Sequence, residues 1–239
     1  MRIDKLLSNL GFGSRKEVKK FLKKGSVSVN GQVIKDPKHH VHPHEDEVFI
    51  FGEEVEYREY IYIMMNKPSG VISATEDVRE PTVIDLLEEE ERIFKPFPVG
   101  RLDKDTEGLM LLTNDGKLAH QLLSPKKDVP KTYFAIIDGI VTEEDIQLFE
   151  KGVTLDDGYQ TKPGKLHIIK SGTYSDIELT ITEGKYHQVK RMFQAVGKKV
   201  KYLKRVSLGP LVLDKTLKEG EYRELTEEEI GQLKDVDQS

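Results

Sequence analysis

Short apolar segments that end at turn-forming residues recur along this chain, and they limit what it can fold into. The longest, 61–65, is followed almost at once by Lys67-Pro68-Ser69-Gly70. Segments 109–113 and 131–137 have the length of buried strands, while 176–182 alternates apolar and polar side chains as a half-exposed antiparallel strand does. Strands outnumber helices and do not alternate with them strictly. The sequence therefore predicts an α+β fold with a mainly antiparallel, mixed sheet.

Further elements complete this pattern. Thr142 is a favourable N-cap for a helix with an acidic start, and a second helix is expected from His187 to Gly197. More strands are expected at 200–208 and 211–213. Segment 114–116, Asn-Asp-Gly, predicts a turn.

Composition narrows the class of protein. The 239 residues are 37% hydrophobic and 33% charged, which supplies a core for one large domain or two small ones. No segment is long enough to cross a bilayer, and the first five residues lack the apolar segment of an export signal. The absence of cysteine excludes disulfides, thiolate metal ligands and a cysteine nucleophile. We therefore expect a cytoplasmic protein with no membrane partner, and a monomer because no further amphipathic stripe indicates a partner.

Positive charge is concentrated in two segments although the net charge is −5. Residues 1–38 contain 10 basic and 3 acidic side chains, and residues 183–205 contain 8 basic and 1 acidic. Such segments can form the surface on which a polyanion binds, or they can be ordinary solvated faces. On the first interpretation, the basic side chains near the end of the second segment form a path for RNA: Lys198, Lys199, Lys201, Lys204 and Arg205.

The N-terminal segment has the pattern of two helices and a hairpin. Residues 3, 6, 7 and 10 are apolar at the spacing of one helix face, and Ser14 is a favourable N-cap for a second helix. Asn30-Gly31 between two apolar segments predicts a β-hairpin. The outer face of the second helix is crowded with basic side chains: Arg15, Lys16, Lys19, Lys20, Lys23 and Lys24.

This arrangement resembles the S4-type RNA-binding module, over residues 1–58. The resemblance implies a small head with an αα-hairpin that binds structured RNA through its phosphates. Residues 52–59 are expected to be a linker, and residues 59–239 to form the second domain. A tract of four histidines, His39, His40, His42 and His44, lies in a loop without a second ligand cluster, so we assign no metal site.

The densest group of charged residues lies between two glycines, at 100–108, directly before an apolar strand. A loop at the end of a rigid strand can present polar side chains to a cleft. Asp103 and Asp105 fit an acid–base pair, a metal site, or the capping of a turn, and their spacing alone does not choose among these.

Four ordered motifs resemble those of RNA pseudouridine synthases. Segment 100–109, GRLDKDTEGL, and segment 111–116, LLTNDG, match the central motif of that family. Segments 66–70 (NKPSG), 131–133 (KTY) and 183–192 (EGKYHQVKRM) match three more, in the same order. With the S4-like head, the resemblance spans nearly the whole chain and implies the pseudouridine synthase fold. The KRM ending and the short head are typical of the small-subunit type, an isomerase of the 16S rRNA pseudouridine(516) synthase type.

The resemblance assigns roles to residues. Asp103 matches the catalytic aspartate, for which attack at C6 of uracil, attack at C1′ and abstraction of a sugar proton remain open. Lys190 matches its basic partner, and Tyr133 the active-site tyrosine. Arg101 matches a residue that fills the position vacated by the extruded base. Side chains of segment 183–192 are expected at the RNA-binding edge, namely Lys185, Tyr186, His187, Gln188 and Arg191.

The implied reaction exchanges a C–N for a C–C glycosidic bond without gain or loss of atoms, so no cofactor is expected. The implied partner is ribosomal RNA, preferably 16S, or an assembling small ribosomal subunit. A synthase acting on a 23S uridine and a non-catalytic S4-type ribosome assembly protein are alternatives. A third alternative, an aspartyl-phosphate enzyme, is disfavoured because Glu107 and the prolines before Asp103 break its pattern; magnesium dependence would distinguish it.

Overall fold

The computed structural model describes residues 1–55 and 57–236. The chain divides into two compact units, Met1–Ile61 with Leu87–Pro96, and Tyr62–Leu86 with Phe97–Ser239. The sequence predicts a single boundary after residue 58. In the structure, the later segment 87–96 also groups with the first unit. This segment contains the short helix α3 (Glu89–Arg92). Each unit is described by itself.

The first unit begins with the two expected helices, α1 (Ile3–Asn9) and α2 (Arg15–Lys24). A capping box between Ser14 and Glu17 starts α2, and Gly25 in the left-handed conformation ends it. A four-stranded sheet of order β2-β1-β3-β4 follows. Its strands are β1 (Val27–Val29), β2 (Gln32–Val33), β3 (Val48–Ile50) and β4 (Glu53–Glu54).

The apolar faces of both helices and of β1 and β3 form one core. Asn30 and Gly31 both have positive φ, as the predicted hairpin turn requires. The expected linker is wrong in part, because Glu53–Glu54 pairs with β3 as an edge strand. Its two exposed acidic side chains carry no apolar pattern that would indicate a strand.

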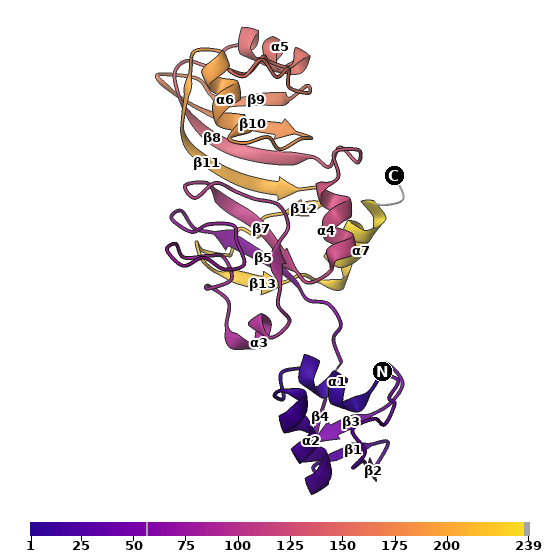
Figure 1. Ribbon diagram of the computed structural model, residues 1–239. Helices are drawn as coiled ribbons and strands as arrows, with labels where there is room; N and C mark the ends of the chain where they lie inside the picture. Colours follow the sequence, from indigo (N-terminus) through magenta and orange to yellow (C-terminus); the bar gives the residue numbers. More distant parts are fainter. Residues whose placement is uncertain (56, 237–239) are drawn as a thin grey trace. The chain divides into compact units, whose positions relative to one another are not determined.

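The second unit is built on a large sheet of order β13-β5-β7-β11-β8-β10-β9, with β6 added to β7 and β12 added to β11 (Figure 1). Only β7 and β11 pair in parallel among its described strands, so the expected mixed, mainly antiparallel sheet is confirmed. The strands are β5 (Tyr62–Lys67), β6 (Phe97–Pro98), β7 (Glu107–Thr113), β8 (Lys131–Asp138), β9 (Lys165–Lys170), β10 (Tyr174–Ile181), β11 (Lys199–Leu208), β12 (Leu211–Val212) and β13 (Tyr222–Glu224).

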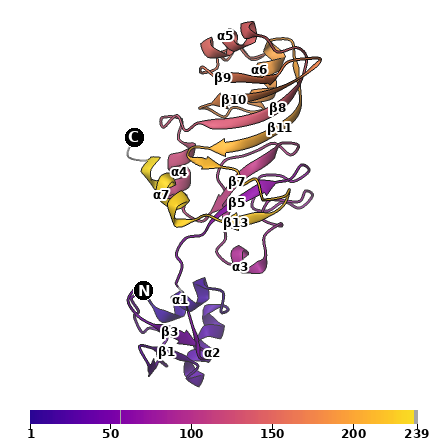
Figure 2. The same cartoon turned by 180° about the vertical axis from the view of Figure 1, so that it is seen from behind.

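Within the described part of this unit, four helices accompany the sheet. Helices α4 (Gly116–Leu123) and α7 (Glu227–Asp235) lie side by side in Figures 1 and 2, and both contribute to a core that includes apolar side chains of β5, β7 and β11. Helices α5 (Glu143–Lys151) and α6 (Gln188–Ala195) meet through Phe149 and Phe193, whose ring centroids are 4.9 Å apart. Thr142 caps α5 as expected.

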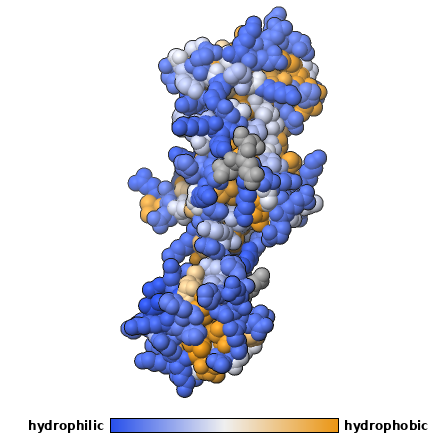
Figure 3. All heavy atoms as spheres, turned by 90° about the vertical axis from the view of Figure 1, so that its right-hand side faces the viewer, coloured by the Kyte–Doolittle hydropathy of each residue, from blue (hydrophilic) through white to orange (hydrophobic). Residues whose placement is uncertain are grey.

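The expected turn at 114–116 is instead the start of α4. The Asp115 carboxylate accepts hydrogen bonds from the backbone N–H groups of Lys117 and Leu118, at 3.1 and 3.0 Å, and so acts as an N-cap. Hydrophilic side chains cover most of the face seen in Figure 3. Within 1–55 and 57–236, no helix has the length and apolar character needed to span a bilayer.

Candidate active site

The site lies within the second unit, where four strands of the sheet are in register. Gly108 on β7 pairs with Lys67 on β5 and with Arg205 on β11, and Arg205 pairs with Tyr133 on β8. Residues far apart in the sequence are thereby fixed in one row across the sheet. The charged loop that precedes β7 starts from this row.

Gly108 allows the close approach of β7 and β11. Its φ is +101°, and a Cβ atom there would lie 2.2 Å from the carbonyl oxygen of Arg205. Any other residue would therefore push β7 away from β11. The close approach of the two strands therefore explains why the central motif has glycine at this position.

The loop between Arg101 and Thr106 is held by Lys67, the last residue of β5, and by Ser73 in the segment that follows β5. The ammonium group of Lys67, fully buried, donates hydrogen bonds to the carbonyl oxygens of Thr106 at 2.7 Å and Lys104 at 3.3 Å. The Ser73 hydroxyl donates to Leu102 O and accepts from Leu102 N, at 2.9 and 3.0 Å. Burial lowers the pKa of Lys67 to about 8. These contacts fix the backbone on both sides of Asp103.

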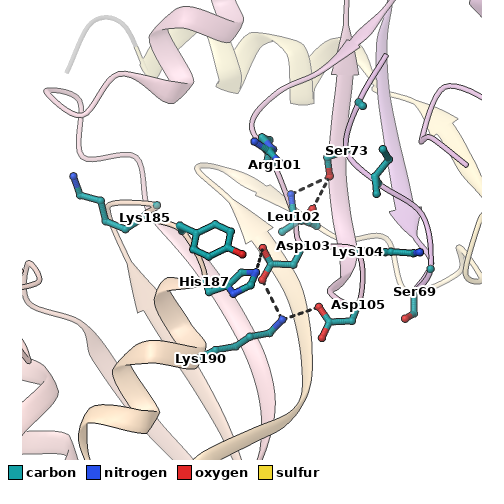
Figure 4. A pocket seen from close by; sticks show the side chains of 15 residues that line it. Ser69, Ser73, Arg101, Leu102, Asp103, Lys104, Asp105, Lys185, His187 and Lys190 are labelled. Carbon is teal, nitrogen blue, oxygen red and sulfur yellow. Dashed lines mark hydrogen bonds and ion pairs between the residues drawn. The ribbon is translucent and has the colours of Figure 1, made fainter. Parts of the chain in front are cut away.

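Asp103 and Asp105 point from this loop toward Lys190 on α6 (Figure 4). Lys190 Nζ lies 3.1 Å from Asp103 Oδ2 and 2.6 Å from Asp105 Oδ1. His187 Nε2 lies 3.6 Å from Asp103 Oδ1. The side chain of Asp103 is 27% exposed, whereas that of Asp105 is 69% exposed. Both carboxylates therefore have the Lys190 cation beside them, and Asp103 is the more sheltered of the two.

The ion pairs favour the charged forms of the groups that form them. Partial burial opposes ionisation of Asp105, but the hydrogen bond and charge of Lys190 outweigh it and lower the pKa of the carboxyl group. Burial likewise opposes protonation of Lys190, and the two aspartates outweigh it and raise the pKa of the ammonium group. The cluster therefore favours the ionised form of the Asp105 carboxyl group and the charged form of Lys190.

A buried carboxylate positions the segment that leads into α6. Glu183 accepts hydrogen bonds from the Tyr159 hydroxyl at 2.7 Å, from the backbone N–H of Lys162 at 2.9 Å and from Gln188 Nε2 at 2.7 Å. The oxygen of the Gln188 amide accepts from the backbone N–H of Lys185 at 2.8 Å. His187 enters α6 with a left-handed backbone, φ 49°, and its ring stacks on Tyr186.

The two sides enclose a groove of about 1170 Å³, lined by the Asp103 loop, by residues 69, 70 and 72–74 after β5 and by residues 184–187 with Lys190. A smaller cavity opens beside Asp103, and Tyr133 with three apolar side chains, Ile181, Val189 and Leu203, lines it. The Asp103 carboxylate therefore faces a cavity whose lining includes an aromatic ring and aliphatic groups. Such a space can hold a flat, uncharged base and exclude water from it.

Most of the expected site residues come together here. Asp103, Lys190, Tyr133, Arg101, Lys185 and His187 all line the cavity beside Asp103. The basic residues expected on the second helix, Arg15, Lys16, Lys19, Lys20 and Lys23, are exposed on α2 of the first unit, while Val18 and Leu22 face its core.

Several expected RNA contacts have other partners in the structure. Gln188 is buried, and its amide is used within the loop as described above. Arg191 forms ion pairs with Asp156 and Asp157. Of the expected RNA path, Arg205 is buried in the sheet and Lys198 is paired with the buried Asp145 at 2.7 Å. The basic run 198–205 is therefore not one exposed surface, because alternate residues of β11 face opposite sides of the sheet.

Sequence reasoning missed the roles of Lys67, Ser73 and Glu183. Lys67 and Glu183 lie in motifs that were recognised. Nothing in their spacing indicated that both side chains are buried and form hydrogen bonds with backbone groups of neighbouring segments. A buried lysine needs acceptors that the fold supplies, so the register must be known first. Among the described residues, no group of three or more His, Asp or Glu side chains is arranged to hold a metal ion.

Comparison with protein families matches residues 61–195 to the RNA pseudouridylate synthase family and residues 1–48 to the S4 domain. An RNA pseudouridine synthase of Bacillus subtilis, described as uncharacterized, is 59% identical, with 98% of each chain covered. Ribosomal small subunit pseudouridine synthase A of Escherichia coli is 38% identical over 98% of this chain and all of that protein. Ribosomal large subunit pseudouridine synthase B of Bacillus subtilis is 39% identical over 98% of this chain and 95% of that protein.

A crystal structure of a pseudouridylate synthase superposes with a TM-score of 0.68 at 37% identity, covering 98% of this chain and 99% of the other. That likeness extends over both units. Three of the four motifs recognised in the sequence line the groove, and the fourth, through Tyr133, lines the cavity beside Asp103. The chain therefore belongs to the family of RNA pseudouridine synthases, and it carries an N-terminal S4 domain.

Proposed function

We propose that this protein acts in the cytoplasm and isomerises one uridine of 16S ribosomal RNA, at position 516 in the type it resembles, with Asp103 as the catalytic carboxylate. The observation that carries the proposal is the ion pair of Lys190 Nζ with Asp103 Oδ2, 3.1 Å apart, at the mouth of the cavity lined by Tyr133. The target RNA is ribosomal 16S RNA itself or an assembling small subunit.

Each side chain has a distinct task in this proposal. Asp103 must be ionised to act at the junction of sugar and base, and Lys190 stabilises that charge. Tyr133 stacks on the extruded uracil. The apolar side chains of Ile181, Val189 and Leu203 keep water away while the base is detached from C1′, turned, and rejoined through C5.

The RNA outside the cavity is bound mainly through charge. Arg101 and Lys185 lie at the rim of the groove, and the stacked rings of Tyr186 and His187, with centroids 3.8 Å apart, offer an exposed surface to a base. The basic side chains of α2 add phosphate contacts from the S4 domain.

Two relatives of similar identity bear on the choice of RNA. The small-subunit enzyme of Escherichia coli aligns with this chain over its whole length, and this similarity supports a 16S target. The large-subunit enzyme of Bacillus subtilis supports a 23S uridine as the second candidate.

The experiment that tests the proposal follows release of tritium from uridine labelled at C5. Separate 16S and 23S transcripts, and a partly assembled small-subunit particle, are each incubated with the protein in the presence of EDTA. We expect release from 16S RNA, free or in the particle, and none from 23S RNA. Release from 23S RNA alone would contradict the proposed target while keeping the reaction. No release from any of the three would contradict the proposed activity.

A further inference from the structure

A second cavity adjoins the one beside Asp103 and is lined largely by basic side chains. Its volume is about 260 Å³, well above the about 30 Å³ that a water occupies in the liquid. The two cavities share Arg101, Tyr133 and Lys185. The basic residues that line the second cavity are Arg101, Lys131, Lys162, Lys185 and Arg205.

Arg205 is the most constrained of these side chains. Its residue is 2% exposed, and its Nε donates to the carbonyl oxygen of Leu109 at 2.8 Å. Its Nη2 is buried and has no acceptor within the described residues. A buried guanidinium nitrogen without an acceptor is costly, and the contact that favours the charged guanidinium is with the Tyr133 side chain.

Lys131 adds a second cation at the same cavity. Its Nζ donates to the carbonyl oxygen of Val129 at 2.9 Å. Burial, and then the positive charge of Arg205, lower the pKa of Lys131 to about 8, and Asp128 opposes this only partly. Two neighbouring cations that disfavour each other mark a place where an arriving anion is stabilised.

The acidic groups near this cavity are already used. Asp128 is paired with Lys162, which also reaches the Pro125 carbonyl. Glu183, the carboxylate in the cavity lining, accepts hydrogen bonds from Tyr159, Lys162 N and Gln188, as described above. Neither carboxylate is therefore available to neutralise both Lys131 and Arg205.

We propose that this cavity binds a backbone phosphate of the RNA substrate next to the target uridine, with Lys131 and Arg205 as its ligands. The inference rests on the proposed function, because a nucleotide delivered to Asp103 carries a phosphodiester on each side. Tyr133 and Arg101 line both cavities, so base and phosphate are held by adjoining surfaces. A guanidinium with a free N–H suits a phosphate oxygen, since it can donate in a fixed plane.

Salt dependence of RNA binding tests this site in the full chain. Lys131→Gln removes one phosphate contact, so the slope of log K against log salt for the 16S transcript becomes shallower by about 0.7 to 0.9. Lys131→Arg retains the wild-type slope. The matched control is Lys170→Gln, because Lys170 lies opposite Asp176 in the register of β9 and β10, near the start of β10, while the cavity is lined by Thr182 just after the end of β10. A Lys131→Gln slope equal to that of Lys170→Gln would overturn the proposal.

A neutral phosphate analogue locates the contact. Methylphosphonates are introduced one at a time beside the converted uridine in a synthetic RNA. One of them weakens binding by wild-type protein about tenfold and leaves binding by Lys131→Gln unchanged. If every methylphosphonate has the same effect on both proteins, Lys131 touches no such phosphate and the proposal fails.

Two further measurements separate the possible sources of the anion and the two levels of inference. If inorganic phosphate raises the melting temperature of wild type but not of Lys131→Gln, while RNA binding is equal, the cavity binds free anions and the RNA assignment is wrong.

Tritium release is followed on the same RNA. Turnover with an unchanged salt slope would overturn the phosphate site alone. A changed slope without turnover would support the phosphate site and contradict the proposed function.

Discussion

Gly108 has no side chain because the backbone of β11 occupies the space that one would need. On either side of it in the sheet lie two buried cations, Lys67 and Arg205. Lys67 holds the backbone of the Asp103 loop, and Arg205 faces the second cavity. Single residues on this row therefore couple the packing of the sheet to the position of the catalytic loop.

Gly108→Ala tests that coupling. Because its Cβ would collide with the carbonyl of Arg205, we expect a loss of about 2 kcal/mol or more in the free energy of unfolding, measured by urea denaturation. Gly158→Ala is the matched control, because Gly158 also has a positive φ, +82°, but a Cβ there meets no atom within 4 Å. Equal losses in both variants would show that backbone strain, and not the β7–β11 contact, sets the cost.

At the scale of elements, α2 combines a local stability device with a basic surface. The capping box of Ser14 and Glu17 fixes its start, and Val18 and Leu22 anchor it to the core of the first unit. The exposed lysines are therefore free of a structural task. Their removal should alter RNA binding without unfolding the helix.

The triple variant Lys16→Gln, Lys20→Gln and Lys23→Gln is predicted to bind the rRNA transcript more weakly. Three lost phosphate contacts reduce the slope of log K against log salt by about 2 to 3. Filter binding across a salt series measures this slope, and circular dichroism checks that the helix content is retained. An unchanged slope would mean that α2 does not contact RNA phosphates.

The elements that could be predicted are those with local signals. Ser14 and Thr142 identified helix starts, and Asn30-Gly31 identified the hairpin. Helix α4 was missed because Asn-Asp-Gly is typical of a turn. Only the helical spacing of the apolar residues that follow, Leu118, Ala119 and Leu122, shows that Asp115 is the N-cap of a helix. The edge strands β9 and β13 depend on pairing with β10 and β5, which no local pattern reveals.

The residues of the site likewise fall into those that the sequence could identify and those that it could not. Asp103, Tyr133 and Lys190 could be identified because each lies in a contiguous motif, although its role remains a proposal. The pairing of Gly108 with both Lys67 and Arg205 could not, because it depends on the register of three strands. Arg205 was therefore expected on an exposed RNA path when it is in fact buried.

At the scale of the whole molecule, the buried Lys67 and the half-buried Lys131 predict how stability depends on pH. Lys67 and Lys131 have pKa values of about 8, below the 10.5 of a free lysine, in both cases mainly because of burial. Between pH 8 and about 10 the unfolded chain binds more protons than the native one, so stability rises with pH. Above pH 10 the raised pKa values of Tyr57, Tyr159 and Tyr202 act in the opposite direction.

Urea denaturation at pH 7.5 and 9.5 measures this effect. We expect the free energy of unfolding to increase by about 1 kcal/mol per lysine, after allowance for solvent screening. Lys131→Gln should show a smaller increase than wild type, since one of the two groups is gone. A fall in stability over this interval would contradict the proposed burial of these charges.

The most direct test of the account concerns the two carboxylates that share Lys190. Single-turnover conversion is measured for wild type, Asp103→Asn and Asp105→Asn on the same RNA, together with RNA affinity. We predict that Asp103→Asn lowers the rate by about three orders of magnitude or more while affinity is kept. Asp105→Asn should lower the rate less than about tenfold, because its ion pair is exposed. Equal rates for the two variants would contradict Asp103 as the catalytic carboxylate.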